Sequence, residues 1–346
     1  MRVTRMWSGA AGPLPVHLGL QGGGAHGAVT WGVLDRLLEA ERFAIRAVSG
    51  TSAGAMNAVV LADGLARGGP AAARTALADF WQAVGQSARL SPVRRGVIDQ
   101  LRGRDGLDHS LGYLMVDGLS RLVPPRTLNP RGLDPLREIL AARVDFERVA
   151  QGSVSVHVAA TEVATGRPRV FSGPQVGVEA VLASACLPQL YPAVEIDGTA
   201  YWDGGFSANP ALAPLVADTS SRDIVIVQLN PVVRPEVPCG ARQIINRMGE
   251  IGFNAPLVAE LDALARRRGF SRPRLHRIAG GETPDLVASG RLDADPAHLT
   301  RLFEEGRRRA EIWLAGPAAL VGRAGTLDRG EFRSASRGAP PRRRAG

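Results

Sequence analysis

The chain is poor in the features that mark secreted or membrane-embedded proteins. It has only two cysteines, Cys186 and Cys239, in 346 residues, so we expect no disulfide framework and a reducing cytosol. Neither cysteine has a partner at metal-ligand spacing, and we expect no metal or other cofactor. No apolar run reaches the roughly 18 residues of a transmembrane helix. Residues 1–14 hold two arginines but no apolar core of about 7 residues, so we expect no signal peptide.

Aromatic residues are also scarce, at 5% of the sequence, and no known nucleic-acid module is present, so no nucleic-acid partner is expected. The net charge is nevertheless +9, carried by arginine. The last residues, 337–346, read RGAPPRRRAG. Such a tail is either a solvated terminus or a segment attracted to anionic lipid headgroups, at about 1 kcal/mol per basic residue. We expect a cytoplasmic protein, with peripheral contact to an anionic membrane as the functional interpretation of this tail.

The most informative stretch is a G-x-S-x-G pentapeptide at 50–54, with Ser52 at its centre. The apolar run at 43–48 predicts a strand before it, and the run rich in alanine and valine after it predicts a helix. A serine between a strand and a helix sits on a sharp turn, and the flanking glycines leave room for that turn and for a substrate. This pattern also arises by chance in chains rich in glycine and alanine, but its context favours a nucleophile.

A second glycine-rich turn, at 22–27, lies between a predicted strand at 16–20 and a predicted helix at 28–40. It also satisfies the dinucleotide fingerprint G-x-G-x-x-G. That fingerprint requires an acidic residue at the end of the second strand, where this chain has the Ser-Gly-Thr-Ser of residues 49–52. We therefore expect the exposed N–H groups of Gly23 and Gly24, at a helix N-terminus, to bind an oxyanion instead.

The third motif is Asp203-Gly204-Gly205, which follows a predicted hairpin at 194–202 that turns at Asp197-Gly198. On its own, an aspartate followed by two glycines is typical of a turn.

The rest of the pattern predicts a single α/β domain over residues 15–322, with three layers, α/β/α, around a mostly parallel sheet. Further strands are expected at 154–160, 169–171, 223–229 and 275–278. Further helices are expected at 136–142, 178–186, 243–268 and 296–320, and at 61–84 as a pair broken at Gly64 and at 68–70. In the helix at 243–268 the expected core residues are Ile244, Ile245, Met248, Ile251, Leu257, Leu261 and Leu264.

Three segments are expected outside the regular structure. Residues 1–14 are predicted to be a disordered N-terminal tail, and residues 323–346 a basic disordered C-terminal tail. The irregular stretch at 86–130 is either a lid or insertion near a binding site or plain surface structure.

Taken together and in order, the motifs at 22–27, 50–54 and 203–205 resemble the signature set of the patatin-like phospholipases. The sequence A-S-A-C-L-P at 183–188 and Asn209-Pro210 are also similar to this family, and the resemblance is good over about 16–229. It implies a Ser–Asp dyad in place of a triad, with Ser52 as the nucleophile and Asp203 as its base. It also implies an oxyanion hole formed by Gly22, Gly23 and Gly24.

His26 departs from the family, which usually has Arg or Lys at this position. A histidine adds positive charge beside the loop only when it is protonated, and its reference pKa is about 6.5. Either the backbone N–H groups suffice and His26 only supports the loop, or activity depends on pH at this residue; we favour the first.

A conventional α/β-hydrolase triad would use Ser52, Asp203 and either His276 or His298. In that fold a long stretch of sheet normally precedes the nucleophile, whereas here one strand and one helix do. The dyad is therefore preferred.

The resemblance implies a serine acyl hydrolase that cleaves carboxyl esters of lipids, of the phospholipase A or lysophospholipase type, through an acyl-serine intermediate. Two alternatives stay open: hydrolysis of another acyl ester, such as a polyester or thioester, and a non-catalytic lipid-binding member that keeps the fold.

Overall fold

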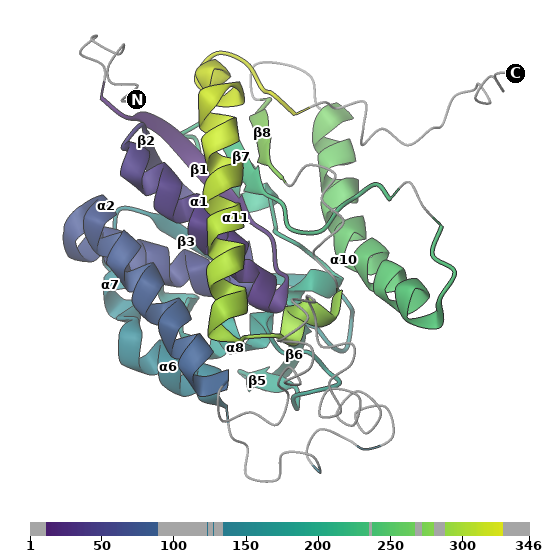
Figure 1. Ribbon diagram of the computed structural model, residues 1–346. Helices are drawn as coiled ribbons and strands as arrows, with labels where there is room; N and C mark the ends of the chain where they lie inside the picture. Colours follow the sequence, from purple (N-terminus) through teal and green to yellow (C-terminus); the bar gives the residue numbers. More distant parts are fainter. Residues whose placement is uncertain are drawn as a thin grey trace, which may run out of the picture.

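A computed structural model describes residues 12–88, 123, 127, 134–234, 237–266, 272–279 and 288–327. Among these, eight strands form one sheet in the order β5-β6-β3-β2-β1-β7-β8, with β4 paired to β3 (Figure 1). The strands are β1 (Leu14–Leu20), β2 (Phe43–Thr51), β3 (Ser155–Glu162), β4 (Pro168–Ser172), β5 (Val194–Ile196), β6 (Thr199–Asp203), β7 (Asp223–Val227) and β8 (Arg274–Ile278). The pairings β1–β2, β2–β3, β1–β7 and β7–β8 are parallel, while β3–β4, β3–β6 and β5–β6 are antiparallel. The predicted mostly parallel sheet is confirmed.

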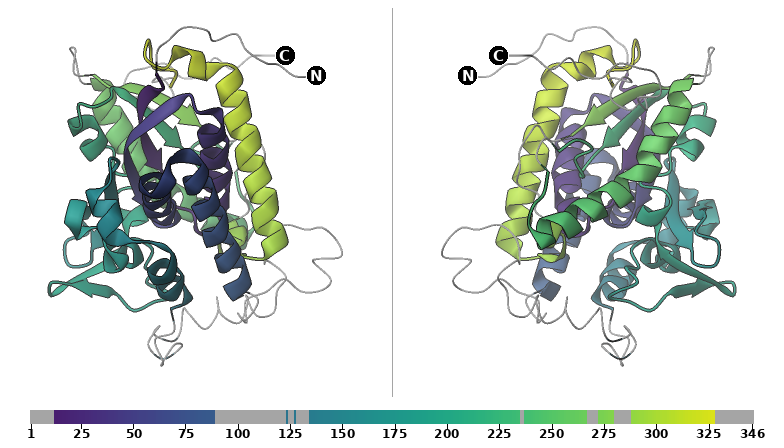
Figure 2. Two further views of the ribbon diagram at one scale, coloured as in Figure 1. Left: turned by 90° about the vertical axis from the view of Figure 1, so that its left-hand side faces the viewer. Right: turned by 90° about the vertical axis from the view of Figure 1, so that its right-hand side faces the viewer.

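Helices cover both faces of this sheet. One face carries α1 (Gly27–Ala40), α2 (Ala53–Ala88), α6 (Pro135–Arg143), α7 (Phe146–Gln151), α8 (Val178–Ser184) and α11 (Pro296–Ala315), which share the larger apolar core. The other face carries α9 (Ala213–Ala217) and α10 (Ala241–Arg266), whose leucines pack on β7 and β8. Figure 2 shows α11 and α10 on opposite sides of the sheet. The three-layer prediction is therefore confirmed.

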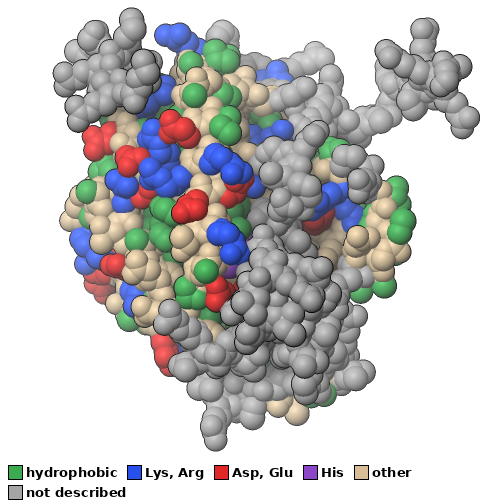
Figure 3. All heavy atoms as spheres, viewed as in Figure 1, with side chains coloured by type: hydrophobic (Ala, Val, Ile, Leu, Met, Phe, Trp, Pro, Cys, Tyr) green, Lys and Arg blue, Asp and Glu red, His purple; other side chains and the backbone are tan. Residues whose placement is uncertain are grey.

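The helices α1 and α11 cross at two glycines. A Cβ atom on Gly32 would stand 1.9 Å from the carbonyl oxygen of Phe303, and one on Gly306 would stand 2.0 Å from that of Val29. Only glycine permits backbones to approach so closely. Arg307 of α11 and Arg74 of α2 then both pair with Asp35 of α1, and arginine and acidic side chains are interleaved on this face (Figure 3).

The expected break at Gly64 is wrong. The segment α2 leaves helical geometry only at Gly68 and Gly69. Gly64 stays helical and allows a close contact with the segment around Ala73, because a Cβ atom at position 64 would lie 2.4 Å from the Cα of Ala73.

The predicted core of α10 is also partly wrong. Leu257, Leu261 and Leu264 are buried, as expected, but the four apolar residues before them are exposed: Ile244 by 42%, Ile245 by 47%, Met248 by 66% and Ile251 by 53%. At about 100° per residue, these four residues lie on the opposite side of α10 from the three leucines. The buried side of the helix continues through Glu250 and Asn254, each 4% exposed. The exposed residues are therefore on the side of the helix that faces away from the body.

The described chain differs a little from the expected boundaries at its ends. Leu14 already belongs to β1. Beyond residue 322, the N–H groups of Thr326 and Leu327 donate to the carbonyl of Leu275. Of the expected lid at 86–130, residues 86–88 belong to α2, and apart from single residues at 123 and 127 the remainder lies outside the described part. No helix within the described ranges combines the length and apolarity needed to cross a bilayer.

Candidate active site

Ser52 occupies a strained turn between β2, which ends at Thr51, and α2, which begins at Ala53. Its φ is 55°, in the left-handed region that a serine rarely adopts. The flanking glycines are required by close approach: a Cβ atom on Gly50 would lie 2.3 Å from the carbonyl oxygen of Gly54, and one on Gly54 would lie 2.2 Å from that of Leu20. The G-x-S-x-G spacing is therefore explained by packing against the end of β1.

Buried hydrogen bonds hold this turn in place. The N–H of Ser52 donates to Ser184 Oγ at 2.9 Å, and that hydroxyl donates to the carbonyl of Ala159 on β3 at 2.5 Å. Thr51 Oγ1 donates to the carbonyl of Ala208 at 2.7 Å. Ser184 therefore supports the backbone of Ser52, and nothing in the sequence pattern singled it out for this.

Asp203 ends β6 and is only 1% exposed. The Ser52 side chain lies close enough to its carboxylate to favour the ionised form, and the Gly205 N–H donates to Asp203 Oδ1 at 2.7 Å. Burial raises the pKa of Asp203 to about 6, although these two groups and the positive charge of Arg291 act in the opposite direction. The structure thus brings the predicted alcohol and carboxylate together and gives the carboxylate the basicity of a proton acceptor near neutral pH.

The glycine loop lies against the nucleophile. A Cβ atom on Gly22 would stand 2.8 Å from the Cβ of Ser52. The N–H of Gly22 donates to Asn209 Oδ1 at 2.7 Å, so this predicted oxyanion donor is already engaged within the protein. Within the described chain, the N–H groups of Gly23 and Gly24 have no hydrogen-bond partner. They are the loop amides that remain available to an oxyanion.

Hydrogen bonds from buried amide side chains hold this loop in place. Gln21 Oε1 accepts hydrogen bonds from the N–H groups of Leu229 and Asn230, both at 2.8 Å. Its Nε2 donates to Asn254 Oδ1 of α10 at 2.9 Å. The loop is therefore tied both to the chain after β7 and to α10.

His26 is 2% exposed and belongs to η1 (Gly24–His26), the turn that leads into α1. Burial lowers its pKa well below the ordinary value, and the nearby Arg291, His298 and Arg309 lower it further. The imidazole is therefore neutral at neutral pH and supplies no positive charge to the loop. In the described structure its Nε2 is buried without a hydrogen-bond partner.

The cation beside the loop is Arg291, from η4 (Ala288–Leu292). Its carbonyl oxygen lies where a Cβ atom on Gly24 would be, at 2.3 Å. Its Nη2 donates to Asn230 Oδ1 at 2.6 Å, and Asn230 Nδ2 donates to the Gly22 carbonyl at 3.4 Å. Its Nε is buried without a partner in the described structure. Burial lowers the pKa of Arg291, but Glu250 and Asp203 oppose this, and a guanidinium stays protonated in proteins.

No local pattern in the sequence singles out Arg291 among the many arginines. Only the fold shows that it meets the loop.

The histidines of the alternative triad are placed elsewhere. His276 Nε2 is 3.0 Å from Asp223 Oδ1, in a group with Arg274 that holds the pKa of Asp223 well below its usual range. His298 lies close enough to His26 to lower its pKa. Neither is among the groups that shift the pKa of Asp203, whereas Ser52 is. Across the described ranges, no three His, Cys, Asp or Glu side chains gather as metal ligands would.

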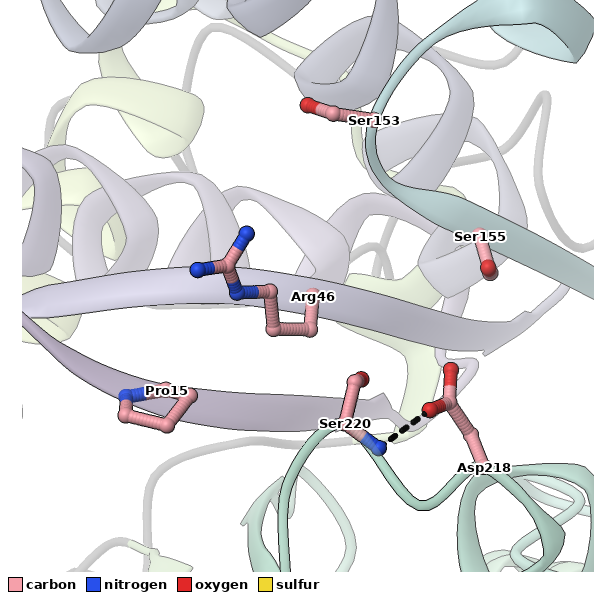
Figure 4. A pocket seen from close by; sticks show the side chains of 6 residues that line it. All are labelled: Pro15, Arg46, Ser153, Ser155, Asp218 and Ser220. Carbon is pink, nitrogen blue, oxygen red and sulfur yellow. Dashed lines mark hydrogen bonds between the residues drawn. The ribbon is translucent and has the colours of Figure 1, made fainter.

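A hollow of about 380 Å³ lies at the amino-terminal end of the strands, at the other end of the sheet from Ser52 (Figure 4). Arg46, Ser153, Ser155 and Asp218 line it. Here the N–H of Ser220 donates to Asp218 at 2.8 Å.

Several solved structures are similar to this chain. VipD from Legionella pneumophila is 16% identical with a TM-score of 0.44, over 88% of this chain and 67% of that chain. The type III effector protein ExoU is 18% identical with a TM-score of 0.34, over 88% and 53%. The ExoU–SpcU complex from the type III secretion system of Pseudomonas aeruginosa is 17% identical with a TM-score of 0.32, over 87% and 52%. This chain thus spans about half the length of the ExoU chains.

No curated protein matches the sequence. Residues 18–216 match the family model described as patatin-like phospholipase. Because this stretch is more than half of the chain and carries Ser52, Asp203 and the glycine loop, the protein belongs to the patatin-like phospholipases, a family of carboxylic ester hydrolases.

Proposed function

We propose that the protein is a serine acyl hydrolase that cleaves carboxyl esters of lipids through a Ser52–Asp203 dyad. One observation carries the proposal: the Ser52 side chain lies close enough to the buried Asp203 carboxylate to lower its pKa, beside two loop amides that have no hydrogen-bond partner in the described structure. A serine hydroxyl is a poor nucleophile until a base lies within hydrogen-bond reach. The dyad supplies that base with no intervening imidazole.

In the first half-reaction Ser52 Oγ attacks the ester carbonyl carbon while its proton passes to the Asp203 carboxylate. The carbonyl oxygen becomes an oxyanion that accepts hydrogen bonds from the N–H groups of Gly23 and Gly24. Each such donor is worth about 3 kcal/mol of transition-state stabilisation. The carbon–oxygen bond to the leaving alcohol then breaks, and Asp203 returns its proton to that alcohol. An acyl-serine remains.

In the second half-reaction a water molecule attacks the acyl carbonyl and gives a proton to Asp203. The bond to Ser52 Oγ breaks, and the serine oxygen takes the proton back from Asp203. The carboxylic acid leaves, and the dyad returns to its starting state.

Arg291 acts as a positioning residue in this scheme. Its permanent charge lies beside the loop where His26 is neutral, and it favours both the ionised form of Asp203 and the developing oxyanion. Arg291 also donates to Asn230, which in turn donates to the Gly22 carbonyl, and these two hydrogen bonds fix the orientation of the loop.

The test is labelling by a fluorophosphonate probe together with a lipid-hydrolysis assay. We expect the wild type to be labelled and active and Ser52→Ala to be neither. Ser155→Ala, an exposed serine at the other end of the sheet, is the matched control and should behave as wild type. A wild type that takes no label would favour a non-catalytic lipid-binding role.

A substrate panel then separates the remaining alternatives. It should contain a phospholipid, a lysophospholipid, an acylglycerol, an aliphatic polyester and an acyl thioester. Turnover confined to the last two substrates would overturn the lipid-ester proposal while leaving the dyad intact.

A further inference from the structure

The first half of α10 presents an apolar surface to solvent. We call it the α10 apolar face: Ile244, Ile245, Met248 and Ile251, each between 42% and 66% exposed. These positions are spaced i, i+1, i+4 and i+7, which places them on one side of a helix. Four large exposed apolar residues on one helix side are uncommon unless something covers them.

The described structure shows that this side of the helix is not packed against the body. A Cβ atom on Gly249 or on Gly252 would meet nothing within 4 Å. The other side of the same helix is buried, through Glu250 and Asn254 in its first half and through Leu257, Leu261 and Leu264 under β7 and β8. The face is thus an outer surface of the molecule.

The face lies at the same end of the sheet as Ser52. Because α10 follows β7 and runs back toward β8, its first half lies at the carboxyl end of the strands, where Ser52 also lies (Figures 1 and 2). Phe206, 44% exposed, comes shortly after Asp203, and its ring lies 5.1 Å from that of Phe253 on α10. Val233 and Val237, 64% and 84% exposed, are further exposed apolar residues on the chain that leads into the helix.

Positive charge borders this surface. Arg234 and Arg247 share a single carboxylate, that of Glu250, at 2.7 Å and 3.1 Å. Two guanidinium groups on one carboxylate leave a positive excess, because only one of the two charges is neutralised. An apolar helix side with a basic border matches a surface with acyl chains inside and anionic headgroups outside.

We propose that the α10 apolar face docks on the surface of a bilayer that contains anionic lipid, so that the carboxyl end of the strands, which carries Ser52 and Asp203, lies beside the interface. The inference rests on the proposed function, since a lipid hydrolase must take its substrate from such a surface. It assigns membrane contact to a folded helix near the site, whereas the sequence pointed to the basic tail.

The experiment compares Met248→Glu, and Met248→Glu with Ile251→Glu, with the wild type. Ile312→Glu is the matched control, because Ile312 on α11 is also 66% exposed but lies outside the face. Binding is measured in a Ser52→Ala background by co-sedimentation with phosphatidylcholine vesicles, with and without phosphatidylglycerol. Activity is measured on the same vesicles and on a short-chain p-nitrophenyl ester in solution. Thermal unfolding checks each variant.

We expect the double variant to lose vesicle binding and vesicle hydrolysis by about tenfold or more, while its turnover of the soluble ester stays within about twofold. Met248→Glu alone should show a smaller loss, and Ile312→Glu none. Binding should be stronger with phosphatidylglycerol present.

Unchanged vesicle binding in the double variant would overturn the proposal. So would a wild-type dimer that the variant converts to a monomer with no change on vesicles, because the face would then be an interface between copies. A wild type that binds vesicles but hydrolyses neither substrate would instead contradict the proposed function and leave the docking surface standing.

Discussion

The two ends of the central sheet carry the same kinds of residue in different environments. Each has an aspartate, serines and an arginine: Asp203, Ser52 and Arg291 at the carboxyl end, and Asp218, Ser220 and Arg46 at the amino end. At the carboxyl end, burial dominates and raises the pKa of the aspartate to about 6. At the amino end, burial also opposes ionisation, but hydrogen bonds from Ser220 outweigh it and lower the pKa of Asp218.

This difference separates a reactive group from an inert one. A carboxylate that accepts hydrogen bonds from water and nearby donors stays ionised at neutral pH. A carboxylate that is buried away from water has a raised pKa and can accept a proton there. Residue types alone would not distinguish the two ends, and the following predictions compare them directly.

The largest expected effect is on turnover in Asp203→Asn. The amide cannot accept the proton of Ser52, so kcat should fall about a thousandfold or more. Asp218→Asn should stay within about twofold. Steady-state assays on a soluble ester measure both, and comparable losses in the two variants would contradict the distinction.

The same substitution, Asp203→Asn, should stabilise the fold. The pKa of Asp203 is about 6 in the folded protein and 3.8 in the reference state, so the folded state holds its proton more tightly. Between these values stability falls as pH rises, because the folded state must give up that proton. At pH 7 the cost is about 3 kcal/mol, at roughly 1.4 kcal/mol per pKa unit.

Urea unfolding of the wild type and Asp203→Asn at neutral pH and near pH 4 measures this effect. The variant should be more stable at neutral pH, and the gain should largely vanish near pH 4. A variant less stable than the wild type at neutral pH would show that the ionised carboxylate is a net stabiliser.

Replacing Arg291 by Gln should lower kcat by about tenfold to a hundredfold. In the wild type, activity should fall as pH drops through about 6, because Asp203 becomes protonated. Without the nearby cation the pKa of Asp203 rises, so this acid limb should move to higher pH. Arg46→Gln, at the other end of the sheet, should change neither kcat nor the pH profile.

Two readouts separate this role of Arg291 from its alternatives. A loss of kcat with no movement of the acid limb would assign Arg291 a purely structural role in holding the loop. A rise of KM confined to anionic substrates would assign it to headgroup binding.

The smallest effect is expected at His26. Its buried imidazole has a pKa well below the ordinary value and is already neutral at neutral pH. His26→Gln should therefore leave the shape of the pH profile unchanged near neutral pH, with kcat within a few-fold of wild type. A profile that changes between pH 6 and 7 would show that His26 titrates there.

Sequence patterns were reliable where the structure depends on neighbours in the chain. The turn at Ser52, the β5–β6 hairpin and the strand β7 all follow from local turn chemistry and apolar runs, and all are present. The prediction that Gly22 donates to an oxyanion could not anticipate Asn209, which is far along the chain and takes that N–H. Arg291 was missed for the same reason.

The helix α10 shows a second limit. Its apolar residues lie on two opposite sides of the helix, and the sequence does not reveal which side the body covers. Met248 is on the exposed side, whereas Leu261 is on the side that packs on the sheet.

The glycine contact between α1 and α11 has a consequence for catalysis. The loop amides directly precede α1, and Arg291 directly precedes α11. The positions of these groups therefore depend on how the two helices pack. Ser52 and Asp203, by contrast, are mounted on the ends of strands. A larger residue at position 32 or 306 would push the two helices apart and would separate the guanidinium ahead of α11 from the loop amides at the start of α1. The rate of the reaction would then be adjustable from a position that touches neither substrate nor dyad.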